Sequence, residues 1–181
     1  MAILELVRPV GKYAEQIMQY KSEIIADSDN INDCEGLKDV ETFEDWVNFE
    51  DRLKAKYGSE YVPRELFLGV RPEDDKVIGM IVYRHPLLPF LLKYGGNIGY
   101  NVLPSERGRG YAADMLNILK PICREYGEEK ILLTCCKLNE ASRRTILKCG
   151  GVMENEVEEI HAEAYNVSKC GIVQRYWINL I

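Results

Sequence analysis

Arginine and glycine alternate in the segment Arg107-Gly108-Arg109-Gly110, which follows the apolar run "NIGYNV" and precedes a helical pattern. A strand that runs through a glycine-rich turn into a helix exposes unpaired backbone N–H groups, and the helix macrodipole adds about half a positive charge there. The two glycines let the backbone approach a ligand closely, and the two arginines can donate charge-assisted hydrogen bonds to phosphate oxygens. The segment predicts a phosphate site, although by composition alone a plain surface turn fits equally well.

Two common nucleotide-binding motifs do not explain this cluster. A P-loop requires a Lys-Ser or Lys-Thr pair after its glycines, and none follows Gly108 and Gly110. A Rossmann site requires G-x-G-x-x-G, usually in the first βαβ unit, with an acidic residue about twenty positions later. The glycines here match half of that pattern and lie in the middle of the chain.

The elements that must position the cluster follow from hydrophobic periodicity and from cap and turn residues. The pattern indicates helices over 8–27, 42–58, 112–127 and 139–151, and strands over 65–70, 76–84, 97–102, 130–136, 152–160 and 172–180. Between the second and third of these strands, "HPLLPFLLKYGG" predicts a loop or a short distorted helix whose apolar side chains could border a ligand site. The order predicts an α/β (α+β) fold, a mixed sheet with helices on both faces.

Length and composition indicate one ordinary globular domain over 1–181. The 181 residues are 46% hydrophobic and 29% charged, and the net charge is −6. This charge disfavours nucleic acid and anionic membrane surfaces as partners. We expect a cytoplasmic protein, because no signal sequence or long apolar span is visible.

The cysteine spacings match no disulfide framework or metal pattern, so we expect reduced, mostly buried thiols and no metal.

The cluster and a second motif together resemble the GNAT acetyltransferase superfamily. "VLPSERGRGYA" is similar to its cofactor motif R/Q-x-x-G-x-G/A, and "NEASRRTILKCGG" resembles its second motif, N-x-x-S/A followed by a glycine. The resemblance covers essentially the whole chain and implies the GNAT acyl-CoA N-acyltransferase fold, a mostly antiparallel sheet. It implies acetyl-CoA as co-substrate, with the pyrophosphate on backbone amides and the pantetheine arm along a strand that ends in a bulge. The implied CoA-binding residues are Val102, Leu103, Arg107, Gly108, Arg109, Gly110, Tyr111, Ala112, Asn139 and Ser142.

The resemblance also implies how acetyl transfer would proceed. A backbone amide near Val102 would stabilise the tetrahedral oxyanion. Many members of the superfamily carry a tyrosine seven residues after the motif asparagine, which protonates the CoA thiolate, but that position holds Ile146. Substitutes for the acid are Tyr100, Tyr111 and Tyr165, of which we favour Tyr100. His85 is the candidate base, because its ordinary pKa, about 6.5, suits proton transfer near neutral pH.

Within the superfamily, the chain looks most like a group of bacterial predicted acetyltransferases of unassigned substrate. The implied function is N-acetylation of an amine acceptor, which is either a protein amino group or a small molecule such as an amino acid, polyamine or aminoglycoside. Because the acid position holds Ile146, a CoA-binding regulatory domain without turnover remains the alternative. Whether the protein forms a homodimer is left open.

Overall fold

The computed structural model describes residues 4–27, 36–58, 61–158 and 171–181. Its strands are β1 (Glu5–Val7), β2 (Arg64–Arg71), β3 (Lys76–Arg84), β4 (Ile98–Val102), β5 (Lys130–Cys136), β6 (Val152–Glu158) and β7 (Ile172–Asn179). Its α-helices are α1 (Ala14–Ala26), α2 (Phe43–Val47), α3 (Phe49–Tyr57), α4 (Tyr111–Glu125) and α5 (Glu140–Lys148). Short helical turns are η1 (Gly11–Tyr13), η2 (Leu37–Asp39), η4 (Leu91–Gly95) and η5 (Pro104–Glu106).

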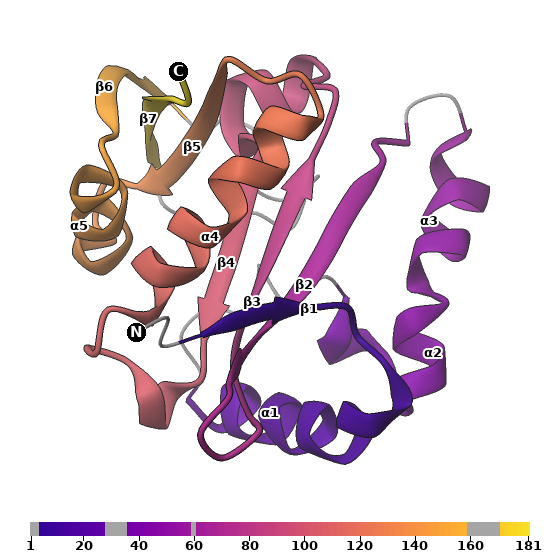
Figure 1. Cartoon of the computed structure of the whole chain (residues 1–181). Helices are drawn as coiled ribbons and strands as arrows, with labels where there is room; N and C mark the ends of the chain where they lie inside the picture. The colour runs from indigo at the N-terminus through magenta and orange to yellow at the C-terminus, as the bar shows by residue number, and fades with distance from the viewer. Residues whose placement is uncertain (1–3, 28–35, 59–60, 159–170) are drawn as a thin grey trace.

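The strands form two antiparallel sheets. One has the order β1-β2-β3-β4 and the other has the order β5-β7-β6. The predicted hairpin of β2 and β3 is confirmed, and the opening apolar run, to which the pattern gave no element, adds β1 to its edge. In Figure 1, α4 and α5 lie to the left of β3, whereas α2 and α3 lie to the right of β2.

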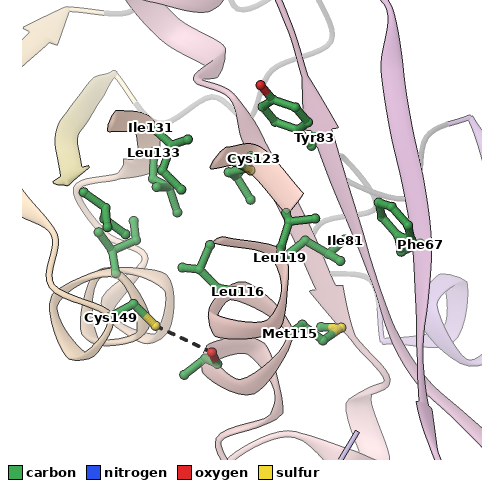
Figure 2. Packing of buried hydrophobic residues seen from close by; sticks show 14 of the residues in the cluster. Phe67, Ile81, Tyr83, Met115, Leu116, Leu119, Cys123, Ile131, Leu133 and Cys149 are labelled. Carbon is green, nitrogen blue, oxygen red and sulfur yellow. Dashed lines mark hydrogen bonds between the residues drawn. The ribbon is translucent and has the colours of Figure 1, made fainter. Parts of the chain in front are cut away.

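Helix α4 packs its apolar face against both sheets. Its side chains Met115, Leu116 and Leu119 are fully buried, and they share one core with residues of both sheets, such as Ile81 of β3 and Ile131 of β5. Figure 2 shows these side chains between the two sheets. The heptad-like spacing of apolar residues in α4 explains why one helix holds both sheets together.

A second core lies on the other face of the first sheet. It joins α1 and α2 to strand residues such as Leu68 and Met80. The predicted cap at Thr42 is confirmed, because its side chain accepts a hydrogen bond from the backbone N–H of Asp45 at 3.1 Å. The single helix predicted over 42–58 is instead two, because the chain leaves helical geometry at Asn48.

The expectation of reduced thiols holds for three cysteines and is wrong for a fourth. Cys123, Cys135 and Cys149 are free and buried. Cys136 follows Cys135 and therefore points to the opposite face of β5, where it is half-buried and disulfide-bonded. Cys34 and Cys170 lie outside the described residues.

None of the described helices is both long and apolar enough to cross a bilayer.

Candidate active site

The predicted phosphate loop presents a row of free backbone amides. Gly108 and Gly110 have φ angles of +78° and +89°, in the left-handed region that glycine adopts without strain. In the described part of the chain, the N–H groups from Gly108 to Ala112 donate to no protein acceptor, and the next two, of Ala113 and Asp114, donate to Gly110 O. Such an array at the start of a 15-residue helix has the geometry that suits an anion, as the sequence predicted.

A buried carboxylate anchors this loop. Glu106 is 4% exposed and faces three cations, with distances of 2.6 Å to Lys76 Nζ, 3.0 Å to a guanidinium nitrogen of Arg109 and 3.2 Å to one of Arg71. The hydrogen bonds from Lys76 and Arg71 hold the pKa of Glu106 below its ordinary value, although burial opposes this. Arg71 also donates to the hydroxyl of Tyr111 at 3.1 Å, which fixes the first residue of α4.

Arg107 connects the loop to two other elements. Its Nε donates to the carbonyl of Val102 at 3.2 Å, and a terminal nitrogen lies 2.5 Å from Asp27 at the end of α1. Arg107 and Arg109 therefore both have carboxylate partners within the protein. The anion that the loop binds would share these guanidinium groups with Asp27 and Glu106.

The two sheets meet at Asn97, directly before β4. Its backbone N–H donates to Leu132 O at 2.7 Å, and its side-chain Oδ1 accepts from Leu132 N at 2.8 Å. Its carbonyl accepts from Arg84 N at 2.7 Å, and its Nδ2 donates to Arg84 O at 3.1 Å. Asn97, which is 1% exposed, therefore joins the end of β3 to β5.

Beyond this joint, β4 and β5 diverge. At Gly96 the two backbones are so close that a Cβ would stand 2.6 Å from Leu132 O. Beyond this point the two strands form no ladder in the described part of the chain and belong to separate sheets, and four residues after Gly96 the Tyr100 hydroxyl lies 2.8 Å from Ser142 Oγ of α5. The strands therefore enclose a wedge that is closed at Asn97 and open towards the phosphate loop. A wedge of this shape fits the elongated arm of a CoA thioester whose phosphates occupy the loop.

The start of α5 faces this wedge. Asn139 caps the helix, because its Oδ1 accepts from Ser142 N at 3.0 Å. This cap fixes Ser142, whose hydroxyl and carbonyl both lie within hydrogen-bonding distance of the Tyr100 hydroxyl. The structure thus brings together Tyr100, Asn139 and Ser142, three of the residues that the sequence singled out.

Strand β4 does not end in the bulge that the family resemblance implied, so this expectation is wrong. The register against β3 is regular from Tyr83↔Ile98 to Gly79↔Val102, and Leu103 N continues it by donating to Ile78 O at 2.9 Å. Since N–H groups alternate in direction along a strand, the amide of Val102 points away from β3, towards the wedge. The Leu103 amide is used within the fold, so Val102 is the better placed of the two for an oxyanion.

His85 lies apart from the other predicted residues. Its ring stacks on Tyr83 at 4.8 Å between centroids and contacts Tyr126 at 4.7 Å. Tyr126 caps the C-terminus of α4, whereas the phosphate loop is at the N-terminus, and a helix of this length measures roughly 22 Å. The role of His85 as a base stays a prediction, and it depends on an acceptor that reaches this end of the sheet.

The structure favours neither of the other two tyrosines as the acid, and it does not favour Cys135 as a nucleophile. Ile146 is fully buried in the core. The Tyr111 hydroxyl accepts a hydrogen bond from Arg71 of β2 at 3.1 Å, and Tyr165 lies outside the described residues. Burial raises the pKa of Cys135 to about 11, so its thiol stays protonated at neutral pH and is a poor nucleophile.

The segment between β3 and β4 covers the face of the second sheet opposite α4. The hydroxyl of Thr134 in β5 donates to Tyr94 O at 2.8 Å, and Arg175 Nε in β7 donates to Leu92 O at 3.1 Å. An open, largely apolar groove of about 400 Å³ lies here, lined by Leu87, Pro89, Leu92, Lys93 and Arg175. The expected distorted helix is confirmed as η4, which is a single π-helical turn.

Sequence reasoning missed the residues that act through distant partners. Asn97 and Glu106 match no specified position of either motif. Each forms a hydrogen bond with a residue 35 positions away, Leu132 for Asn97 and Arg71 for Glu106. The signal that could have identified Glu106 is its position as an acidic residue among the arginines of "SERGRG". A carboxylate beside an anion site repels the ligand unless cations of the protein neutralise its charge.

Comparison with known proteins agrees with this geometry. The model of the Acetyltransferase (GNAT) family matches residues 29–150, which is well over half of the chain. A search of curated protein sequences finds no match.

Several solved structures share the fold. RimL, a ribosomal L7/L12 alpha-N-protein acetyltransferase in complex with CoA, is 17% identical with a TM-score of 0.70, covering 99% of this chain and 95% of its own. The Microcin C7 self immunity acetyltransferase MccE, in complex with acetyl-CoA and AMP, is 18% identical with a TM-score of 0.66, covering 97% and 92%. A SpeG spermidine N-acetyltransferase chimera from Vibrio cholerae and hSSAT is 16% identical with a TM-score of 0.63, covering 98% and 96%.

The loop of free amides, the wedge between β4 and β5 and the matching family model support one conclusion. The protein is an acyltransferase that uses acetyl-CoA as co-substrate, and the chain belongs to the GNAT acetyltransferase family.

Proposed function

We propose that this protein transfers the acetyl group of acetyl-CoA directly to the nitrogen of an amine acceptor. The observation that carries the proposal is the wedge, which leads from the free amides of the phosphate loop to the Tyr100 hydroxyl and ends at Asn97. The wedge orients an extended thioester, and orientation supplies much of the rate acceleration in such reactions. Two structural neighbours are named for amine acceptors, a protein N-terminus and spermidine.

Each bond change has a group in the proposed site. The amine nitrogen bonds to the acetyl carbon, and the C–S bond breaks as the tetrahedral intermediate collapses. The Val102 amide would hold the oxyanion, and the Tyr100 hydroxyl would protonate the leaving thiolate. The proton released by the amine passes to His85 or to water.

The acceptor would approach from the face opposite α4. The other face of the wedge is occupied by α4 and α5, which share the core with β4 and β5. The groove along η4 lies on the open face and could hold the non-reacting part of an acceptor. Protein amino groups and small amines both remain candidates for this position.

The test is release of free CoA thiol with a panel of amines, comprising an amino acid, spermidine and a peptide with a free N-terminus. We expect release above the hydrolytic background with at least one of them, together with a product that is heavier by one acetyl group. If the protein binds CoA but releases no thiol with any amine, it is a CoA-binding regulatory domain and the proposal is wrong.

A further inference from the structure

Lys148 is the last residue of α5 and reaches the phosphate loop. Its Nζ lies 3.6 Å from the point where a Cβ would stand on Gly110, the residue that caps α4. Lys148 lies inside the segment of the second motif, at a position that the motif does not specify, and it had no role in the sequence analysis. The position of its ammonium group beside the free amides therefore needs an explanation.

The end of α5 is fixed against the start of α4. Cys149 Sγ lies 3.7 Å from Ala113 O, which Figure 2 shows as a dashed line, and Lys120 Nζ donates to Cys149 O at 2.8 Å. These contacts hold the backbone next to Lys148 one turn away from the loop. Core packing between the two helices thus fixes the backbone from which the exposed Lys148 side chain extends to the loop.

Lys148 differs from the other cations of the loop in having no carboxylate partner. Arg107 pairs with Asp27 at 2.5 Å, and Arg109 pairs with Glu106 at 3.0 Å. Across the described residues, no acidic side chain lies within 4 Å of Lys148. A cation whose charge is not neutralised gains more from an incoming anion than a cation that already forms an ion pair.

We propose that Lys148 is a CoA-binding residue whose ammonium group contacts the pyrophosphate held by the amides of Gly108 to Ala112. The backbone amides fix the position of the phosphates by hydrogen bonds, and Lys148 supplies the full positive charge that these neutral donors lack. Because the pyrophosphate does not change during acetyl transfer, the interaction is equal in the ground and transition states. It therefore lowers the KM for acetyl-CoA and leaves kcat unchanged.

The test is calorimetric titration of CoA into the wild-type protein and into Lys148→Gln, without any acceptor. We expect the dissociation constant to rise roughly five- to twentyfold in Lys148→Gln, as for loss of one charge-assisted contact at a partly exposed site. Lys148→Arg should recover most of the affinity, because it keeps the charge. Arg144→Gln is the matched control, since it removes one exposed cation one turn earlier on the same helix and should change the affinity less than twofold.

Titration of 3′-dephospho-CoA identifies the phosphate involved. Lys148→Gln should weaken this ligand by the same factor as CoA, because both ligands retain the pyrophosphate. If Lys148→Gln and the wild type bind 3′-dephospho-CoA equally well, the lysine acts at the 3′-phosphate and the assignment to the loop is wrong. Equal binding of CoA to wild type and Lys148→Gln, or an equal loss in Arg144→Gln, would also overturn the proposal. Thermal unfolding of each ligand-free variant shows whether the fold is intact.

Discussion

Tyr100 is the residue on which the proposed chemistry depends most. Its hydroxyl crosses from β4 to Ser142 of α5, at the side of the wedge where the thioester arm would lie. The family's usual position for this hydroxyl holds the buried Ile146, so a tyrosine from the facing strand would take its place. A hydroxyl anchored by a serine at 2.8 Å is oriented before any ligand binds, which favours proton transfer.

We expect Tyr100→Phe to lower kcat by about tenfold to a hundredfold, because positioned general acids contribute on the order of a hundredfold or more. The KM for acetyl-CoA should change less than about threefold, since the phosphate loop is untouched. Steady-state kinetics with any accepted amine measures both values. Tyr13→Phe is the control, because it removes a hydroxyl that contacts Asp75 in a different part of the molecule. A kcat within twofold of wild type in Tyr100→Phe would remove this residue from the mechanism.

At the scale of elements, the joint between β4 and β5 determines the shape of the site. Asn97 uses both its backbone and its carboxamide at this joint, so that its side chain takes the place of a backbone carbonyl opposite Leu132. Pairing therefore ends here, and the strands separate towards the loop. The wedge would lose its closed end if these bonds were absent.

We expect Asn97→Ala to lower the free energy of unfolding by about 2–5 kcal/mol, because Leu132 N–H and Arg84 C=O would be left buried without partners. The KM for acetyl-CoA should rise in the same variant, because the separation of the strands is no longer fixed. Denaturant unfolding measures the first effect and initial rates measure the second. Asn179→Ala, at an exposed position in β7, should change neither. A loss below about 0.5 kcal/mol in Asn97→Ala would contradict the role of this joint.

At the scale of the whole molecule, the proposed CoA site is shared by parts that are distant in sequence. Strand β4, the loop and the starts of α4 and α5 would surround the ligand, while Asp27 at the end of α1 holds the loop. Helix α4 connects all of these to both sheets through one core. A ligand that contacts this many elements should stabilise the entire fold against unfolding.

Acetyl-CoA at a hundred times its dissociation constant should therefore stabilise the protein by about 2.7 kcal/mol. For a chain of this size, that corresponds to a rise in Tm of roughly 5–10 °C. Thermal unfolding monitored by circular dichroism, with and without the ligand, measures the shift. Pantetheine, which lacks the phosphates, is the control and should have little effect at the same concentration. No change in Tm with millimolar acetyl-CoA would contradict binding at this site.

Local signals in the sequence were enough to predict most of the elements and the glycine turn before α4. Gly108 and Gly110 between a strand pattern and a helix pattern predict a turn followed by free amides, because glycine adopts the left-handed conformation without strain and the first amides of a helix have no partner within it. The cap at Asn139 and the apolar stripe of α4 are local in the same sense. The family resemblance extended these signals to acetyl-CoA, which the family model supports.

Only the tertiary structure could decide which groups complete the site. Asn97 and Leu132 are 35 residues apart, and Lys148 reaches Gly110 from another helix, so neither contact leaves a mark in the local pattern. The amide of Leu103 also looked available until the register with β3 showed that Ile78 accepts its hydrogen bond. Hydrophobic periodicity indicates which face of an element is buried, but it does not indicate which other element packs against that face. The sequence by itself therefore determined a glycine turn between a strand and a helix and predicted a phosphate there, whereas packing decided how the strands separate and which cation has no carboxylate partner.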